Sequence, residues 1–428
     1  MGRSIGLDVH REFCEVAVSD GGPARSAGRV GTSAEQLQLL ALSLEAGDRV
    51  VLEATGNALA IARILAPHCA EVLLAHPKRL RAISHAKVKT DKLDARVLAE
   101  LLAANLIPAV WIPDEQTRRL RRQISRRRAL VKRCTAMKNE ISAVLIRNLK
   151  RRPEATDVFG RTGREWLHRL ELPLDERETV DACLRQLDFV TRELSMIDTQ
   201  IAEAAIRSAQ MRRLMTIPGV DATTAATVIA AIGDVTRFPS SRHLVGYLGL
   251  HPKVRQSGSS PAHHGRTSKE GPAAARHVLV EAAWITTRGP GPLRAFGQRV
   301  AARRGKHIAA VAVARKLATL AWHMLTHEQD YAFQRPTLTR RKLRRLELMT
   351  GAPRVKPGPN HTPIRKTGAA QIEWQLAEQA EIAYRRLIAD WQATGPKEGA
   401  GATPGRASQR PSKGKAARQA TRPQTPAL

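Results

Sequence analysis

Four acidic residues in the first hundred positions have the types and spacing of a metal centre. Asp8 lies inside an alternating apolar segment, residues 4–10, where a carboxylate is costly unless it faces a cleft or a cation. Glu53 closes a second apolar segment, residues 49–54, and Asp91 and Asp94 follow three residues apart. Because carboxylate oxygens suit Mg²⁺ whereas zinc prefers Cys or His ligands, these acids indicate a magnesium site.

The pair Asp91 and Asp94 is expected in the first turn of a helix. Thr90 is a suitable N-cap, and leucines recur after it at helical spacing with no Pro or Gly before Asn105. Both carboxylates then project from one face, where a cation could bridge them. The alternative is that the two acids only favour a helix N-terminus, as acids commonly do.

The elements that must position these acids follow the order β-β-β-α-β-α-β-α. Alternation predicts strands at residues 4–10, 14–18 and 27–30, a helix at 34–46, a strand at 49–54, a helix at 57–66 and a strand at 71–76, before the helix that begins at Thr90. This order predicts a mixed sheet covered by helices, whose carboxyl edge carries the site. The four acids could converge there and hold two divalent ions about 4 Å apart, which would activate a nucleophile against a phosphodiester.

Charge is distributed unevenly along the 428 residues. The net charge is +31, yet residues 1–110 hold 13 Lys and Arg against 12 Asp and Glu. The asymmetry predicts a near-neutral catalytic domain joined to basic regions that bind a polyanion. Four separated cysteines indicate reduced thiols in a cytosol, and no leader or membrane-spanning run is evident, so we expect a soluble protein with no membrane partner.

Residues 111–208 are expected to form a basic coiled-coil region. Two long amphipathic segments, from residue 115 and over residues 177–206, carry apolar residues near a 3-4 spacing. Residues 111–152 contain 14 Lys and Arg and three Asp and Glu, a density that favours phosphate contacts over the alternative of a solvated basic face. The candidate nucleic-acid-binding residues are Arg118, Arg119, Arg121, Arg122, Arg126, Arg127 and Lys132.

Residues 209–335 are expected to form a further, mainly helical domain. Residues 214–234 have the pattern of a helix-hairpin-helix in which Gly219 allows close approach to a phosphate, the alternative being a plain core hairpin. A polar loop follows, with Ser257 before Gly258 and the basic residues Arg255, Arg266 and Lys269 around it. Taken alone, this is a flexible loop.

The order Gly-Leu-Asp8-Val-His, Glu53-Ala-Thr-Gly and Lys-Thr-Asp91-Lys-Leu-Asp94-Ala resembles the RuvC-like DEDD domain of insertion-sequence-110 type transposases, grouped with the 116 and 902 elements. Residues 214–250 resemble their C-terminal domain. The resemblance implies an RNase H-like fold for residues 1–110 and Mg²⁺ on Asp8, Glu53, Asp91 and Asp94. It also implies that Ser257 joins covalently to DNA, with Ser259 and Ser260 as rivals. Glu270 and Pro272 depart from what relatives often carry, which weakens the placement of this loop.

The same resemblance implies double-stranded donor and target DNA, a structured non-coding bridge RNA and a homo-oligomer in the bacterial cytoplasm, associated with the nucleoid. Residues 336–393 are expected to be a basic linker and helix, and residues 394–428 a disordered basic tail. Two alternative functions stay open: a RuvC-like junction nuclease that uses water, and a non-catalytic nucleic-acid-binding protein.

Overall fold

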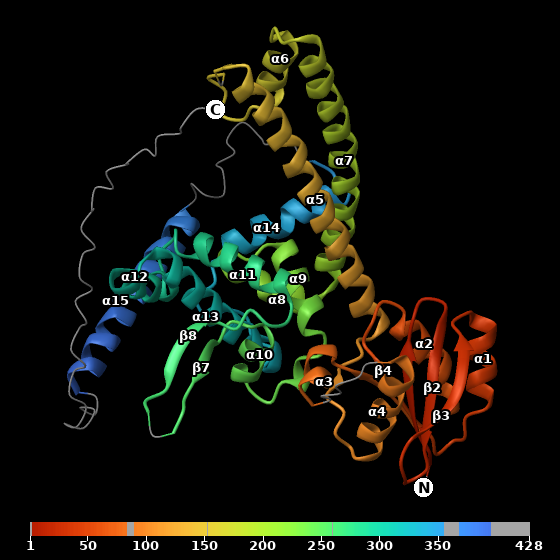
Figure 1. Ribbon diagram of the computed structural model, residues 1–428. Coiled ribbons are helices and arrows are strands. Elements are labelled where there is room, and N and C mark those ends of the chain that lie inside the picture. The colour runs from red at the N-terminus through yellow and green to blue at the C-terminus, as the bar shows by residue number, and fades with distance from the viewer. Residues whose placement is uncertain (1, 84–89, 152, 259, 355–367, 395–428) are drawn as a thin grey trace, which may run out of the picture.

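The chain has an N-terminal mixed α/β domain followed by a mostly helical part (Figure 1). A computed structural model describes residues 2–83, 90–151, 153–258, 260–354 and 368–394. The expected tail therefore lies, apart from residue 394, outside the described residues, as do Val88 and Lys89 of the motif before Asp91 and the rival Ser259.

A six-stranded sheet in the order β3-β2-β1-β4-β5-β6 forms the centre of the N-terminal domain. Strand β1 pairs parallel with β4, and β4 pairs parallel with β5, while the other neighbours are antiparallel. The strands are β1 Ser4–Val9, β2 Phe13–Ser19, β3 Arg25–Gly31, β4 Arg49–Glu53, β5 Glu71–Ala75 and the short β6 Ala109–Val110. The predicted mixed sheet is confirmed, with β6 as an added edge strand.

Helices cover both faces of this sheet because its strands are apolar on both sides. The helices α1 Ala34–Leu42 and α2 Ala58–Leu65, with a 3-10 turn at Ala66–His68, share a core with Ile5 and Leu7 of β1. The helices α3 Pro77–Ile83 and α4 Asp91–Ala103 pack on the opposite face against Val51. Gly6 permits the close contact with α4, since a Cβ there would lie 2.2 Å from the Ala95 carbonyl oxygen.

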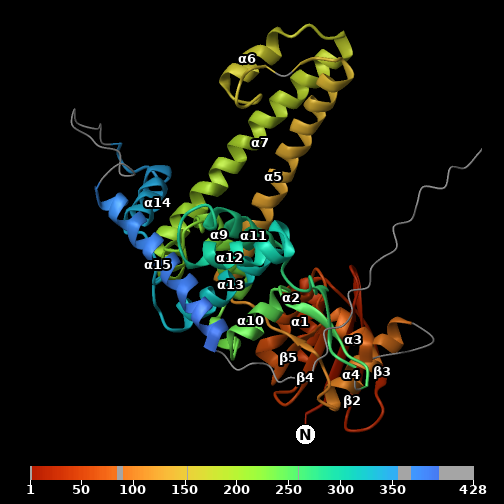
Figure 2. The ribbon, with the colours of Figure 1, turned by 90° about the vertical axis from the view of Figure 1, so that its left-hand side faces the viewer.

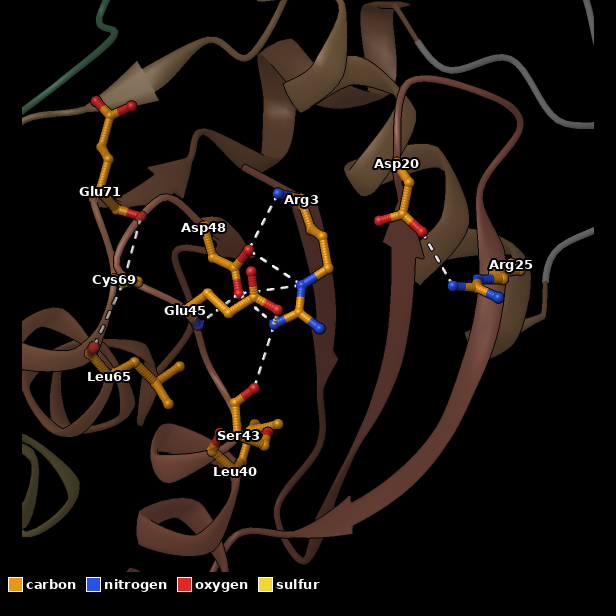
Figure 3. Close-up of polar contacts among 10 residues, drawn as sticks. All are labelled: Arg3, Asp20, Arg25, Leu40, Ser43, Glu45, Asp48, Leu65, Cys69 and Glu71. Atoms are coloured by element: carbon orange, nitrogen blue, oxygen red, sulfur yellow. Dashed lines mark hydrogen bonds and ion pairs between the residues drawn. The ribbon is translucent and has the colours of Figure 1, made fainter. Parts of the chain in front are cut away.

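A buried ion pair joins the beginnings of β1 and β4 (Figure 3). Asp48, which is fully buried, accepts hydrogen bonds from the backbone amides of Arg3 and Glu45 and from the Arg3 guanidinium, whose Nη2 is 2.6 Å from Oδ2. Burial raises the pKa of Asp48, but the hydrogen bonds from Arg3 and from the backbone outweigh it, so that the pKa is lowered overall. The ionised carboxylate therefore stabilises the fold.

Asp48→Asn is expected to lower the free energy of unfolding by about 3 kcal/mol at pH 7, because it removes one charge of a buried, hydrogen-bonded pair. The pKa of Asp48 is lower in the folded protein than in the unfolded chain. Its contribution to stability is therefore fully present at pH values above the unfolded-state pKa of about 4, and it is lost as the pH falls through the folded-state pKa. Urea unfolding of both proteins at pH 7 and pH 3 measures this difference.

Asp20→Asn is the matched control, because Asp20 forms an exposed pair with Arg25 at 2.9 Å in the same domain (Figure 3). An exposed pair contributes less than about 1 kcal/mol. Equal losses in Asp20→Asn and Asp48→Asn, or a difference between the wild type and Asp48→Asn that grows towards pH 3, would contradict the assignment.

Two long helices form an arm that extends away from both parts of the molecule (Figures 1 and 2). They are α5 Glu115–Arg147 and α7 Leu174–Arg207, which run antiparallel, with α6 Arg161–Arg169 at the far end of the arm. Buried residues at helical spacing, Ile124, Ile141, Leu187 and Ile197 among them, hold the two helices together. The two predicted helices are confirmed, whereas regular coiled-coil packing stays a prediction.

The remaining helices between residues 209 and 349 share one continuous core with the arm, from Leu120 to Leu346, and a last helix packs on two of them. They are α8 Ala209–Met215, α9 Ala222–Ile232, α10 Ser241–Tyr247, α11 Ala273–Thr286, α12 Pro292–Arg304, α13 Lys306–Thr326, α14 Pro336–Met349 and α15 Gly368–Thr394, with a 3-10 turn at Val235–Arg237. The strands β7 Pro252–Arg255 and β8 His263–Thr267 form an antiparallel hairpin that projects from this body (Figure 1).

One helix is longer and more apolar than the sequence analysis expects. The sequence was expected to lack any run of membrane-spanning length, but α13 is long and apolar enough by length and composition. Its apolar residues Val313, Leu317 and Leu325 are buried against the other helices, which explains its composition. A core helix and a membrane span share this composition, and packing separates them.

Trp111 contacts the helical part directly after the last strand of the sheet. Its ring lies against Gly233 and leaves no room for a side chain there, since a Cβ would be 2.1 Å from the indole. The φ of +62° at Gly233 also favours glycine. The guanidinium of Arg237 stacks 4.1 Å from the centre of the Trp111 ring, and that of Arg121 lies 5.4 Å away. This contact orients the α/β domain on the helical part.

Candidate metal centre and serine hairpin

Asp8 and Glu53 lie side by side at the carboxyl edge of the sheet. The parallel register pairs Leu7 with Leu52, so the next residue of each strand is one of the two acids. Both face α4, because Gly6 and Val51, two residues earlier in each strand, contact that helix. The edge expected from the order of elements therefore carries these two acids.

Helix α4 begins at the same edge and presents the other two acids. The Thr90 side chain accepts a hydrogen bond from the Leu93 amide, which confirms it as the N-cap, and Asp91 and Asp94 occupy the first turn. Asp91 lies within reach of Asp8, since ligand atoms of Asp8, His10 and Asp91 all lie within 4.8 Å of one another. Asp8 and Asp91 are therefore close enough together to bind the same cation.

The charges at this edge interact strongly. Burial raises the pKa of Asp8; the neighbouring His10 opposes that rise, while the charges of Asp94 and Asp91 add to it. A carboxylate that is disfavoured by burial and by two like charges is stabilised when a cation binds. The residues present therefore fit a divalent metal ion, with oxygen ligands from Asp8 and Asp91 and with Glu53 and Asp94 beside them.

A fifth acid at this edge is already neutralised. Glu15 of β2 pairs with Asp8 in the antiparallel register and is almost completely buried. Its carboxylate accepts hydrogen bonds from Arg29, with Nη2 at 2.5 Å and Nε at 2.8 Å. Glu15 therefore has its own cation and is not a candidate ligand.

His10 is the site residue that the sequence reasoning did not select. Its Nε2 lies 3.3 Å from a carboxylate oxygen of Asp8 and 3.3 Å from one of Asp91. The signal was its place two residues after Asp8 at the end of the strand, where the chain turns back over the edge. A histidine at that position could have been paired with the acids.

Ser257 lies in the exposed loop that connects β7 to β8. In Figure 1 the far end of this hairpin lies well apart from the sheet and from α4, so this loop does not reach the acidic edge within one chain. Arg255, Arg266 and Lys269 are exposed on or beside the hairpin, and their side chains make no hydrogen bond or ion pair within the part of the chain described. A basic hairpin with an exposed hydroxyl near its tip is thus available to another molecule.

Two family models match the two parts that carry these features. One, described as a transposase, is the DEDD type of IS110 elements and matches residues 5–147. The other, described as the transposase IS116/IS110/IS902 family, matches residues 211–298. The chain belongs to the IS116/IS110/IS902 transposase family. The four acids lie in the first match, and Ser257 lies in the second.

Proteins similar to this chain include the putative transposase y4qE of Sinorhizobium fredii, which is 32% identical over 204 residues. This match covers 46% of this chain and 48% of y4qE. The transposase for IS1111A of Coxiella burnetii is 27% identical over 57% of this chain and 68% of its own length. The pilin gene-inverting protein of Moraxella bovis is 26% identical over 66% of this chain and 81% of its own length. The match spans about half the length of y4qE.

Within this IS110-family chain, Arg276 of α11 holds the two ends of the serine hairpin. Its Nη1 is directed at the carbonyl oxygens of Leu248, at 3.0 Å, Glu270, at 2.6 Å, and Gly271, at 3.2 Å. The two ends cross closely, because a Cβ on Gly249 would lie 2.1 Å from the Glu270 carbonyl oxygen. Arg276 therefore sets the direction in which the hairpin leaves the helical part.

Arg276→Gln is expected to loosen the hairpin and to raise hydrogen exchange of the amides in residues 252–267 by about tenfold, because a shorter neutral side chain cannot reach all three carbonyls. Arg276→Lys should restore part of the protection, since an ammonium can donate to the same oxygens. Hydrogen-exchange mass spectrometry of the full chain measures both variants. Unchanged exchange in Arg276→Gln would show that other contacts orient the hairpin.

Five of the seven candidate phosphate-contacting residues on α5 already have partners in the chain. Arg118 and Arg122 pair with Glu115, Arg126 and Arg127 pair with Glu193 and Asp198 of α7, and Arg121 donates to the Ala230 and Ala231 carbonyls. Arg119 and Lys132 are exposed, and their side chains form no hydrogen bond or ion pair with the described residues. These two are the candidates on α5 best placed to contact a phosphate backbone.

Gly219 is packed against the protein itself. Its φ is +90°, and a Cβ there would lie 2.6 Å from the Thr286 hydroxyl oxygen of α11. Lys342 of α14 donates to the carbonyls of Met215, Ile217 and Val220 around the same turn, at 2.6 to 2.9 Å. The glycine therefore has a packing role here, and its contact with a phosphate stays a prediction.

Proposed function

We propose that this protein is a DNA recombinase that cuts and rejoins strands at the ends of an insertion element. The observation that supports this most strongly is the acidic edge inside the region matched by the DEDD transposase model. There Asp8 and Asp91 lie close together, Glu53 ends the neighbouring strand, and Asp94 lies in the same helical turn as Asp91. A relative that inverts a pilin gene suggests that the same chemistry can invert a segment as well as insert one.

The four acids would hold Mg²⁺. When bound, the ions draw negative charge from the phosphodiester and stabilise the leaving oxygen. The carboxylates of Asp8 and Asp91 would hold the ions at this edge of the sheet, and the N-cap at Thr90 fixes the start of α4, which carries Asp91. Each acid acts as a positioning ligand, so all four are expected to be needed together.

Ser257 would supply the nucleophile. Its hydroxyl oxygen attacks the phosphorus, an oxygen–phosphorus bond to the protein forms, and the bond to one deoxyribose oxygen breaks, with that oxygen taking up a proton. A hydroxyl of another strand then attacks the same phosphorus, and the serine regains its proton. The flanking cations Arg255, Arg266 and Lys269 would stabilise the extra negative charge on the phosphoryl group.

A second copy of the chain would bring the serine to the acids, because the β7–β8 hairpin lies apart from the sheet and α4 of its own chain (Figure 1). We therefore propose a homo-oligomer in which the hairpin of one copy reaches the sheet of another. Exposure of the hairpin and its anchoring by Arg276 are compatible with such an exchange.

The basic surfaces would bind double-stranded donor and target DNA and a structured non-coding bridge RNA. The charge outside residues 1–110 is sufficient to attract phosphate backbones, and sequence choice would be left to base pairing with the RNA. Arg119, Lys132 and the basic hairpin are the exposed contacts that we assign to this binding. The protein would act in the bacterial cytoplasm, at the nucleoid.

Trapping of a covalent complex tests the proposal. The protein, Mg²⁺, RNA transcribed from the element's flanking DNA and labelled element-end DNA are mixed and separated under denaturing conditions. We expect a protein–DNA adduct whose peptide maps to residues 252–267. Cut DNA without any adduct would favour the alternative, a RuvC-like nuclease that uses water, which the separation of Ser257 from the acids within one chain supports.

A further inference from the structure

His10 occupies the space between two of the acids. Its Nε2 lies 3.3 Å from oxygens of both Asp8 and Asp91. The atom has almost no exposed surface and forms no hydrogen bond of acceptable geometry within the described residues. An imidazole nitrogen can donate one proton to one acceptor, so it cannot satisfy two carboxylates together.

Three contacts, two on the backbone and one on the ring, hold His10 in this place. The His10 amide donates to the Phe13 carbonyl in the turn between β1 and β2, and the Phe13 ring lies 4.7 Å from the imidazole, centre to centre. The side chain of Asn57 donates to the His10 carbonyl at 3.1 Å. The loop that follows Glu53 thus fixes the turn that carries His10, and Nε2 is directed at the acids before any cation binds.

We propose that His10 is a nitrogen ligand of the cation held by Asp8 and Asp91, and that the site therefore binds Mn²⁺ more tightly than Mg²⁺. A divalent ion placed among these three groups takes a lone pair from Nε2 and satisfies both carboxylates. Imidazole suits transition metals, whereas Mg²⁺ strongly prefers oxygen ligands. The inference rests on the metal site of the proposed function and is independent of its serine chemistry.

Calorimetric titration of the metal-free full chain with MnCl₂ or MgCl₂ tests the ligand set. We expect His10→Asn to lose at least about tenfold in Mn²⁺ affinity and to change Mg²⁺ affinity less than threefold, since water can replace the imidazole for Mg²⁺. Pulsed electron paramagnetic resonance of bound Mn²⁺ should show a nitrogen coupling in the wild type that is absent in His10→Asn.

His263→Asn on the hairpin is the matched control and should leave both affinities unchanged. Asp91→Asn should weaken both metals. Equal losses for the two metals in His10→Asn, or no loss, would overturn the nitrogen ligand, and a gain for both would show that His10 competes with the cation. Tight Mn²⁺ binding with a nitrogen coupling but no DNA cutting would leave this inference standing and sink the proposed recombinase.

Discussion

Ser257→Ala is expected to abolish the covalent protein–DNA complex and to lower strand joining by a factor of about 1,000 or more, because alanine removes the attacking oxygen and leaves water as the only nucleophile. DNA affinity should stay within about twofold, since the flanking cations that contact phosphates are kept. Denaturing gels measure the adduct, and a gel-shift assay measures the affinity.

Ser260→Ala is the matched control for this variant. It removes a hydroxyl from the same exposed loop, three residues away. It should form the adduct at the wild-type rate if Ser257 is the nucleophile. Loss of the adduct in Ser260→Ala with wild-type behaviour in Ser257→Ala would move the role to the rival serine. An unchanged cutting rate in both would favour hydrolysis by the acids alone.

Asp8→Asn is expected to lower the cutting rate by a factor of about 1,000 or more, because an amide is a weak ligand and the phosphodiester loses the charge stabilisation that metal ions supply. The same change should leave thermal stability unchanged or raise it. Burial and the charges of Asp94 and Asp91 raise the pKa of Asp8, so its ionised form is disfavoured in the folded protein. Differential scanning fluorimetry and a cutting assay measure the two effects.

Glu71→Gln provides the control, since Glu71 starts β5 at the opposite edge of the sheet and pairs with Arg49 at 3.1 Å. It should keep the full cutting rate. A full cutting rate in Asp8→Asn would show that cutting does not depend on Asp8. Nucleic-acid binding without any cutting by the wild type would favour the remaining alternative, a protein that binds nucleic acid without cutting it. A clear fall in thermal stability of Asp8→Asn would show that Asp8 serves the fold more than the site.

The sheet was largely predictable because the alternation of apolar and polar residues along a strand is a local property of the sequence. The strands at residues 4–10, 14–18, 49–54 and 71–76 match β1, β2, β4 and β5 to within about two residues, and the helices after Thr90 and from Glu115 begin where expected. The short helices α3, α6 and α12 were not predicted. Their positions depend on contacts with distant elements, such as Leu80 of α3 against Leu98 of α4.

The arginine cluster on α5 shows the limit of a charge count. Density predicted a phosphate surface, but Glu193 and Asp198 of α7 neutralise Arg126 and Arg127, and Arg121 caps the end of α9. These partners lie 67 to 109 residues away in the chain. A run of like charges identifies a basic surface only after the partners on the facing helix are known.

The types of the chemical groups, and the sheet edge that carries Asp8 and Glu53, follow from the sequence alone, because strand order and the alternation of apolar residues place them there. Three features depend on the folded chain: His10 lies beside the acids, Gly219 packs on α11, and the β7–β8 hairpin stands apart from the sheet of its own chain. Periodicity is encoded in neighbouring residues. These contacts, by contrast, arise when segments far apart in the chain pack together, because the folded arrangement is the one that leaves the fewest unpaired buried charges and the smallest cavities.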